Sequence, residues 1–226
     1  MERQDHLKTA LVALTSALGP IGGPLAVLLQ DYIPGTMAEK QKEAMRLVGE
    51  DLKRLEKRLD DSKLRSEAFH ITLVKTLRMM SLERHPDKLE AFRGIVANEA
   101  LKPSDGSEAE FFLGVTENLT GEHIRLLKIL ANPEAFANSL PDLKKRLDGI
   151  SMGGIGALLE PAFPKLTRGH LESMLDDIYR KSLGSLKRDS YGITMSRSGI
   201  MAKTTTKIGD DYLQFISLPP ECKGGG

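Results

Sequence analysis

The chain has 226 residues, and its 32 Lys and Arg against 31 Asp and Glu give a net charge of +1, which excludes a global field that would draw it to nucleic acid or anionic lipid. Hydrophobic residues make up 40% and charged residues 28%, which excludes a disordered chain and one that is membrane-like throughout, and allows one or two folded domains. A single cysteine, Cys222, excludes a disulfide within the chain and favours a reducing, cytoplasmic setting.

The first notable segment, Thr9–Gln30, contains no charged residue and is about long enough to span a bilayer. A single span is disfavoured, because the glycines and prolines between Gly19 and Pro24 would break the helix and leave backbone groups unpaired in lipid. The segment instead predicts two short apolar helices, over 7–18 and 25–33, joined as a hairpin that packs inside a helical bundle. One alternative stays open, in which the hairpin leaves the protein and enters a membrane when triggered.

Residues from Met37 to about Arg65 show regular helical spacing with charged flanks. The apolar positions that follow one another at alternating steps of three and four are Met45, Val48, Leu52, Leu55 and Leu59. The pattern allows two interpretations: a long helix packed in a bundle, or a coiled coil through which two chains form a dimer.

Three further amphipathic helices are expected in the first half of the chain. Their apolar faces carry Phe69, Leu73, Leu77 and Met80 in the first, Leu89, Phe92 and Val96 in the second, and Phe111, Phe112 and Val115 in the third. The second opens at Pro86, a residue favoured in a first helical turn. Ser107 and Glu110 have capping-box spacing and predict the start of the third.

The second half predicts shorter helices followed by a hairpin. Helices are expected over 120–132, 140–147, 167–184 and 208–216. Tyr191, Ile193 and Met195 alternate with a period of two, Ser198-Gly199 predicts a turn, and 200–206 is the expected return strand.

This order of elements, with helices followed by a two-stranded hairpin, is that of a winged helix-turn-helix. We therefore predict a mostly α fold in which an N-terminal helical bundle precedes a C-terminal winged helix-turn-helix with a small β-hairpin. The expected boundaries are 1–118 for the helical domain, with its apolar hairpin and long charged helix, 119–218 for the winged-helix-like domain, and 219–226 for a flexible tail.

Several short runs carry a resemblance to known proteins. TKIGDDYLQFI at 206–216 and GGPLAVLL at 22–29, the latter followed by a long charged helix, resemble uncharacterised bacterial helical proteins with a C-terminal winged-helix domain. AFRGIVAN at 91–98 and LTGEHI at 119–124 are distantly similar to the abortive-infection Abi-alpha type. The resemblance implies a bacterial or mobile-element origin and a role in phage defence.

The run HPDK at 85–88 is the tetrapeptide that J-domain co-chaperones place between two helices. Its flanks differ from a J-domain, since the preceding residues 66–84 contain no tyrosine and only scattered charge. The alternative is a helix-start turn, in which Pro86 takes the first position and Asp87 is favoured by the helix dipole.

Nothing in the sequence predicts an enzyme. The five histidines lack the close helical spacing of a zinc site, no glycine-rich loop is followed by Lys-Ser or Lys-Thr, and no serine lies in a nucleophile elbow. Paired carboxylates such as Asp176-Asp177 lie beside basic residues in solvated stretches. We therefore expect no catalytic, cofactor or metal site.

DNA is the partner that a winged helix suggests, although the charges from Lys165 onward are mixed, at 10 basic against 7 acidic. The candidate nucleic-acid contacts are Arg168, His170, Lys187, Arg188, Arg197, Lys203 and Lys207.

The favoured function is a non-enzymatic bacterial defence or mobile-element protein that acts through protein interaction or self-association, with the winged helix as a sensing or docking module. Two alternatives are a dimeric DNA-binding regulator and a membrane-damaging effector that uses the apolar hairpin on activation.

Overall fold

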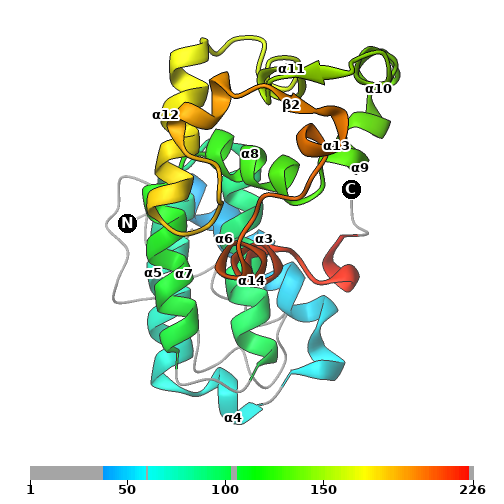
Figure 1. Cartoon of the computed structure of the whole chain (residues 1–226). Coiled ribbons are helices and arrows are strands. Elements are labelled where there is room, and N and C mark those ends of the chain that lie inside the picture. Colours follow the sequence, from blue (N-terminus) through cyan, green and yellow to red (C-terminus); the bar gives the residue numbers. More distant parts are fainter. Residues whose placement is uncertain (1–37, 60, 103–105, 224–226) are drawn as a thin grey trace. The chain divides into compact units, whose positions relative to one another are not determined.

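The computed structural model describes residues 38–59, 61–102 and 106–223, and in these ranges the chain is mostly helical, as the sequence predicts (Figure 1). The predicted N-terminal hairpin lies outside the described residues. The chain divides into two compact units, of which the first holds the described residues up to 120 and those from 215 onward, and the second holds 121–214. None of the helices in the described ranges combines the length and the apolar character that a membrane crossing requires.

The elements follow one another closely in both units. Those of the first unit are α3 (Ala38–Arg54), a 3-10 turn (Glu56–Arg58), α4 (Asp61–Leu64), α5 (Glu67–Leu82), α6 (Pro86–Leu101), α7 (Ser107–Asn118) and a second 3-10 turn (Pro220–Cys222). Those that begin in the second unit are α8 (Gly121–Ala131), α9 (Pro133–Ser139), α10 (Pro141–Asp148), β1 (Met152–Gly153), α11 (Gly156–Leu159), α12 (Arg168–Arg180), a 3-10 turn (Arg188–Gly192), β2 (Met195–Ser196), α13 (Arg197–Ile200) and α14 (Lys207–Ile216).

In the first unit, α3, α5, α6 and α7 pack against one another. α3 and α6 run in the same direction, because Asp51 meets Arg93 and, one turn further along both helices, Leu55 packs against Ala97. α5 runs the opposite way, since the short link over 83–85 joins it to α6 and the two helices pack together. The start of α3 therefore lies at the same end of the unit as the end of α5.

Local sequence explains where these helices begin. The Ser66 hydroxyl accepts a hydrogen bond from the Phe69 amide at 3.2 Å and caps α5, and Pro86 is the first residue of α6.

The predicted capping box at Ser107 is wrong. Gly106, with a left-handed φ of 87°, precedes the helix, so Ser107 is already inside it, and the Glu110 side chain reaches Lys75 instead.

The helix predicted from Met37 to about Arg65 is shorter than expected. α3 ends at Arg54, and the chain turns through Leu55 into the 3-10 turn before Leu59 becomes extended. Met45, Val48, Leu52 and Leu55 are 1–2% exposed, and Leu59 packs against the cluster around Leu55. Packing inside one chain thus accounts for the regular spacing, and these four side chains present no surface to a second copy in this structure.

The residues from 215 onward belong with the first unit. Leu218 and Cys222 join Leu55 and Ala97 in one buried cluster, so 219–223 do not form a free tail. The end of α14 passes very close to α6 where the chain returns to the first unit. A Cβ on Gly94 would lie 1.9 Å from the Ile216 carbonyl oxygen, so this approach requires glycine. The division after Thr120 lies two residues from the predicted boundary.

The helices of the second unit agree with expectation more closely than its strands do. The Asn132 side chain caps α9 by accepting a hydrogen bond from the Ala135 amide at 3.0 Å, and Thr167 caps α12. The predicted apolar face of α12 is buried and consists of Leu171, Met174, Leu175 and Ile178.

The predicted hairpin is wrong. Tyr191 lies in a 3-10 turn, and the Ser196 hydroxyl accepts a hydrogen bond from the Gly199 amide at 3.3 Å, which starts α13 where the hairpin turn was expected. β2 instead pairs antiparallel with β1, placing Met152 opposite Ser196. The expected return strand is also replaced, since the Thr204 amide donates to the Leu130 carbonyl at 3.0 Å.

Candidate functional site

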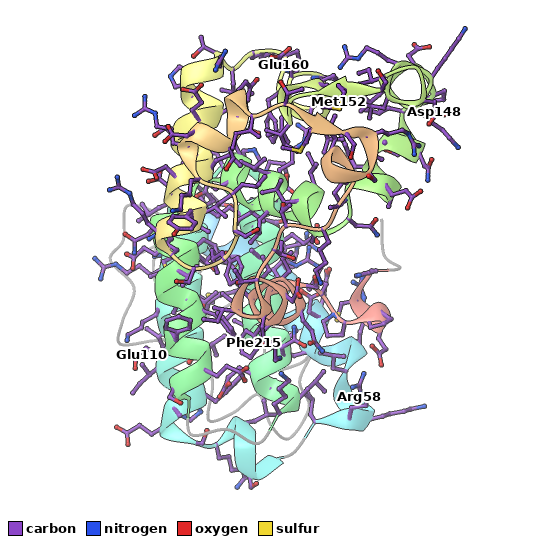
Figure 2. The ribbon with its side chains drawn as sticks, in the orientation of Figure 1. Arg58, Glu110, Asp148, Met152, Glu160 and Phe215 are labelled. Carbon is purple, nitrogen blue, oxygen red and sulfur yellow. The ribbon has the colours of Figure 1, made fainter. Side chains whose placement is uncertain are left out.

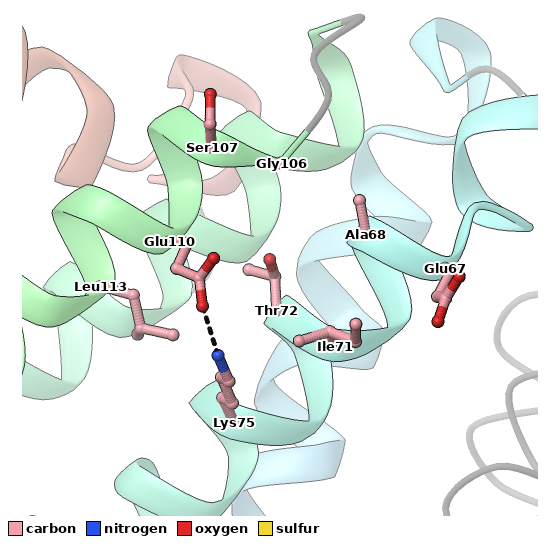
Figure 3. Close-up of a pocket in the computed structure, with 9 residues that line it drawn as sticks. All are labelled: Glu67, Ala68, Ile71, Thr72, Lys75, Gly106, Ser107, Glu110 and Leu113. Atoms are coloured by element: carbon pink, nitrogen blue, oxygen red, sulfur yellow. Dashed lines mark hydrogen bonds and ion pairs between the residues drawn. The ribbon is translucent and has the colours of Figure 1, made fainter.

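The most promising surface of the first unit is a groove between α5 and α7, called the α5–α7 groove below. It consists of two adjoining hollows of about 320 and 470 Å³, and Figure 3 shows the first. Lys75, Glu110 and Leu113 line both hollows and therefore mark the place where they join. α5 and α7 both run antiparallel to α6, so the groove follows two helices that run in the same direction.

The charges at the centre of the groove neutralise one another. The Lys75 ammonium donates to Glu110 Oε1 at 2.6 Å across the space between the helices (Figure 3). This hydrogen bond and the positive charge of Lys75 lower the pKa of the Glu110 carboxyl, which favours its ionised form. Both side chains are exposed, and the pair sets the polarity of the groove more than it stabilises the fold.

Apolar side chains line the walls and the floor. Ile71 is 46% exposed at the wall of the first hollow and Leu82 is 59% exposed at the wall of the second, whereas Leu113 is buried beneath both. Aliphatic side chains of this size gain about 1.5–3 kcal/mol from full burial, so a partner that covers them would bind with a hydrophobic contribution. Polar and charged side chains share the lining, among them Glu67 in the first hollow and Arg78 in the second. Exposed aliphatic side chains bordered by polar ones are a feature of protein-interaction sites.

The second unit holds all seven candidate nucleic-acid contacts, and five of the seven lie within ion-pair distance of a carboxylate. The pairs are Arg168–Glu172 at 2.7 Å, Arg188–Glu172 at 3.8 Å, Arg197–Asp148 at 2.6 Å, Lys203–Asp210 at 2.6 Å and Lys207–Asp211 at 2.9 Å. Of the other two, Lys187 lies over the Tyr179 ring and His170 contacts the Thr167 hydroxyl at 2.9 Å. Neighbouring carboxylates cancel much of the potential that a phosphate would experience.

Arg168 and Arg197 have different neighbours. The Arg168 guanidinium lies over the Tyr191 ring, and the Tyr191 hydroxyl donates to Glu160 at 2.8 Å. Asp148, the partner of Arg197, is well separated from Glu160 in Figure 2. Arg168 and Arg197 thus have separate partners within the second unit.

Comparisons with known proteins add no assignment. No family model, curated protein or solved structure matches the chain. Within the described residues, no group of three or more His, Cys, Asp or Glu side chains is placed to hold a metal ion.

The HPDK run at 85–88 has contacts that suit a turn between helices. The Glu83 carboxylate accepts hydrogen bonds from the backbone amides of Arg84 and His85 at 2.8 and 2.9 Å. Lys88 lies 3.5 Å from Glu83 and donates to the Glu117 carbonyl at 3.1 Å. These bonds fix the chain between α5 and α6, which is the role that the helix-start interpretation gives to the run.

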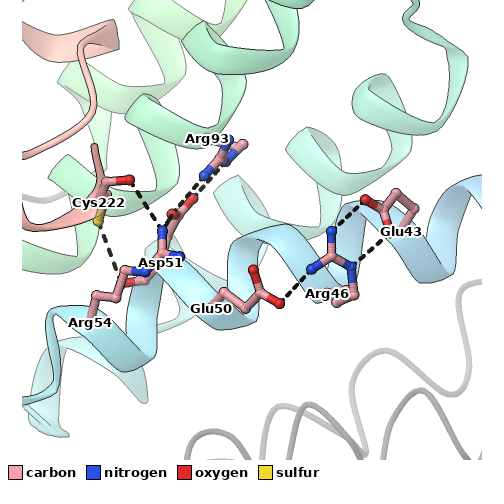
Figure 4. A network of polar contacts seen from close by, with 7 residues as sticks. All are labelled: Glu43, Arg46, Glu50, Asp51, Arg54, Arg93 and Cys222. Carbon is pink, nitrogen blue, oxygen red and sulfur yellow. Dashed lines mark hydrogen bonds and ion pairs between the residues drawn. The ribbon is translucent and has the colours of Figure 1, made fainter. Parts of the chain in front are cut away.

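A buried polar network holds the C-terminal segment on α3. Asp51, which is 2% exposed, accepts two hydrogen bonds from the Arg93 guanidinium at 2.7 and 2.8 Å (Figure 4). Arg54 donates to the Cys222 carbonyl at 3.2 Å, and the Cys222 thiol lies 3.6 Å from the Asp51 carbonyl oxygen. Every polar group named here has a partner within the first unit, so this network is structural and offers no binding site.

The groove residues were not among the sequence candidates. Ile71 and Leu82 lie off the buried face that Phe69, Leu73 and Leu77 mark on α5. Their signal was weak but present, since each is a large aliphatic residue on the charged side of an amphipathic helix. The sequence pattern assigns Glu110 only to a capping box.

Proposed function

We propose that the protein is non-enzymatic and acts through protein interaction, and that the α5–α7 groove is the surface it uses. The observation that carries the proposal is the exposure of Ile71 and Leu82, at 46% and 59%, beside hollows of about 320 and 470 Å³. A surface of this kind gains free energy when a protein segment covers it.

The geometry favours a helical occupant of low charge. Two helices in the same direction leave a lengthwise groove that a third helix can fill with side chains at spacings of three and four residues. Because Lys75 and Glu110 satisfy each other, an apolar helix needs no counter-charge at the centre of the groove. A strongly charged helix would have to replace that pair and would gain less.

For the second unit we propose a winged-helix-like scaffold with a docking role. The support is the order of its elements, in which β1 precedes α11 and α12 and pairs with β2 after them. The phage-defence or mobile-element setting is a proposal that rests on the resemblance of the short sequence runs. The gene neighbourhood of the protein tests it, since defence and mobile-element genes are expected there.

DNA binding remains the alternative function of another class, and the ion pairs of the second unit count against it. A regulator needs cations that are free to face phosphate, whereas Arg197, Lys203 and Lys207 each lie within 3 Å of a carboxylate. The membrane-effector alternative concerns Thr9–Gln30, which lies outside the described residues. Liposome leakage by the full chain is its test.

Affinity purification of the tagged full chain from cells that produce it tests the groove. A partner is expected to co-purify with the wild-type chain and to be lost from a chain with both Ile71→Glu and Leu82→Glu. Both side chains are exposed, so the variant should fold normally, which circular dichroism checks. The control is Ile193→Glu, an equally exposed position (55%) in the second unit. Equal recovery with all three chains would contradict the proposal.

A further inference from the structure

We propose that the second hollow of the α5–α7 groove binds the same hollow of a second copy of this chain, so that the protein forms a two-fold symmetric dimer. This inference rests on the proposed function of the groove and names the partner of its second half. In a two-fold interface the same patch lies on both copies, so the patch must complement itself in charge and in shape. The charges of the hollow, the direction of its two helices and the space above Gly114 meet this requirement.

The two walls of the second hollow carry opposite charges. Lys75 and Arg78 line it from α5. Glu110 and Glu117 line it from α7. Lys75 and Glu110 pair with each other at 2.6 Å. Arg78 and Glu117 are exposed, and neither side chain forms an ion pair with another of the described residues, so one cation on α5 and one anion on α7 remain for a partner with the reverse arrangement.

A second copy supplies the reverse arrangement because α5 and α7 lie side by side and run in the same direction (Figure 1). Ala68 lies beside Gly106, and Lys75 meets Glu110 further along both helices. A two-fold axis perpendicular to two such helices exchanges their positions and reverses their direction. α5 of each copy then lies antiparallel to α7 of the other, and the cation of each copy faces the anion of the other.

The spacing along the two helices fits this antiparallel contact. Arg78 and Leu82 are one turn apart on α5, and Glu117 and Gly114 are one turn apart, in the reverse order, on α7. When Arg78 of one copy meets Glu117 of the other, Leu82 therefore lies over Gly114. Leu82 is 59% exposed, and a Cβ on Gly114 would have no atom within 4 Å. The open space above this glycine can thus receive the exposed leucine of the second copy.

The size of the patch predicts a reversible dimer. Eight of the described residues line the hollow. A stable interface takes roughly 20–30 residues from each partner. The exposed contact between Arg78 and Glu117 adds specificity more than affinity. Monomer and dimer should therefore exchange, and the dimer fraction should rise with protein concentration.

Charge reversal tests the inference, with sedimentation velocity of the purified full chain over a series of concentrations as the measurement. Arg78→Glu and Glu117→Arg should each weaken dimerisation at least about tenfold, because each places like charges at both symmetric contacts. Both side chains are exposed, so the variants should fold normally, which circular dichroism checks. The control is Lys145→Glu, which makes the same change of charge as Arg78→Glu at an exposed position of α10 and should leave the dimer constant unchanged.

Mixing the two single variants gives a result that only contact between copies can produce. Each variant chain then meets an opposite charge at both contacts, so the mixture should form a heterodimer about as strongly as the wild-type chain dimerises. Native mass spectrometry with one variant labelled with ¹⁵N identifies the heterodimer. The inference is overturned if the wild-type chain stays monomeric at every concentration, if neither variant weakens the dimer, or if the mixture associates no more strongly than its components. Each of these results would leave the groove open to an external partner.

Discussion

At the scale of single residues, the environment of an ion pair decides what it contributes. Asp51 and Arg93 form a bidentate pair in which the carboxylate is 2% exposed, whereas Arg46 contacts Glu43 and Glu50 on an open helix face where its side chain is 52% exposed (Figure 4). Burial removes water as an alternative partner, so the loss of one partner costs far more in the first case. The two arginines therefore form a matched comparison.

Arg93→Met should destabilise the protein by about 3 kcal/mol, because it removes both hydrogen bonds to the buried Asp51 carboxylate and leaves only Arg54, 3.7 Å away, as a nearby cation. Arg46→Met should change the free energy of unfolding by no more than about 1 kcal/mol. Urea denaturation of the two variants measures both effects. Equal small losses would mean that Asp51 is solvated, contrary to the structure.

Cys222 should be an unreactive thiol in the native protein. Burial, with the nearby Asp51 charge, raises the pKa of this thiol to about 11 from its usual 9.0. Because the raised pKa favours the neutral thiol in the folded state, its contribution to stability is complete below pH 9 and is lost as the pH rises toward 11. Iodoacetamide at pH 8 should therefore modify Cys222 much faster in urea than in buffer. Equal rates would contradict the burial of the C-terminal segment.

At the scale of elements, local sequence determined the helices well and the strands poorly. Periodicity and caps identified α5, α6, α12 and α14, since the signals lie within each helix. β2 could not be found in this way, because its partner β1 lies more than forty residues earlier and the Ser196 cap competes with the expected turn. Spacing does not reveal the end of α3 for a similar reason, since Leu55 packs in a cluster with residues far along the chain.

The candidate site shows the same limit. The sequence identified the cations of the second unit but not the carboxylates that pair with them, some of which, such as Asp148 for Arg197, lie on another element. It also left Ile71 and Leu82 unassigned, because only packing shows which apolar side chains remain uncovered. Pairing and exposure are tertiary properties that spacing alone does not reveal.

The return of the chain to α6 gives a test at this scale. Gly94→Ala should cost about 1–3 kcal/mol, since the new Cβ would meet the Ile216 carbonyl at 1.9 Å and force the segment after α14 away. Gly114→Ala is the control: it lies within α7 with no atom within 4 Å of a new Cβ, and it should gain up to about 1 kcal/mol. Thermal unfolding distinguishes them, and a stabilised Gly94→Ala protein would refute the close approach.

At the scale of the whole molecule, the two units differ in what they offer a partner. The first exposes Ile71 and Leu82 beside a groove whose central ion pair is neutral overall, and the second exposes cations that are mostly paired. We therefore expect binding to depend on apolar contact and only weakly on salt.

DNA binding provides a contrast. Fluorescence anisotropy with mixed duplexes should show no saturable binding by the wild-type chain near 0.15 M salt. A chain with both Asp148→Asn and Asp211→Asn, which releases Arg197 and Lys207 from their partners, should bind measurably at low salt. Tight wild-type binding that Arg197→Ala and Lys203→Ala weaken would favour the regulator instead.

Photo-crosslinking in living cells is the most direct test of the central claim that the α5–α7 groove is a protein-interaction surface. Benzoylphenylalanine is placed at position 82 in the groove and, in a separate chain, at position 193 in the second unit; both sites are similarly exposed. The account predicts a discrete adduct with a second protein from position 82, linked through an apolar helical segment and lost when Ile71→Glu is added. It is contradicted if position 82 gives no adduct, or the same adducts as position 193.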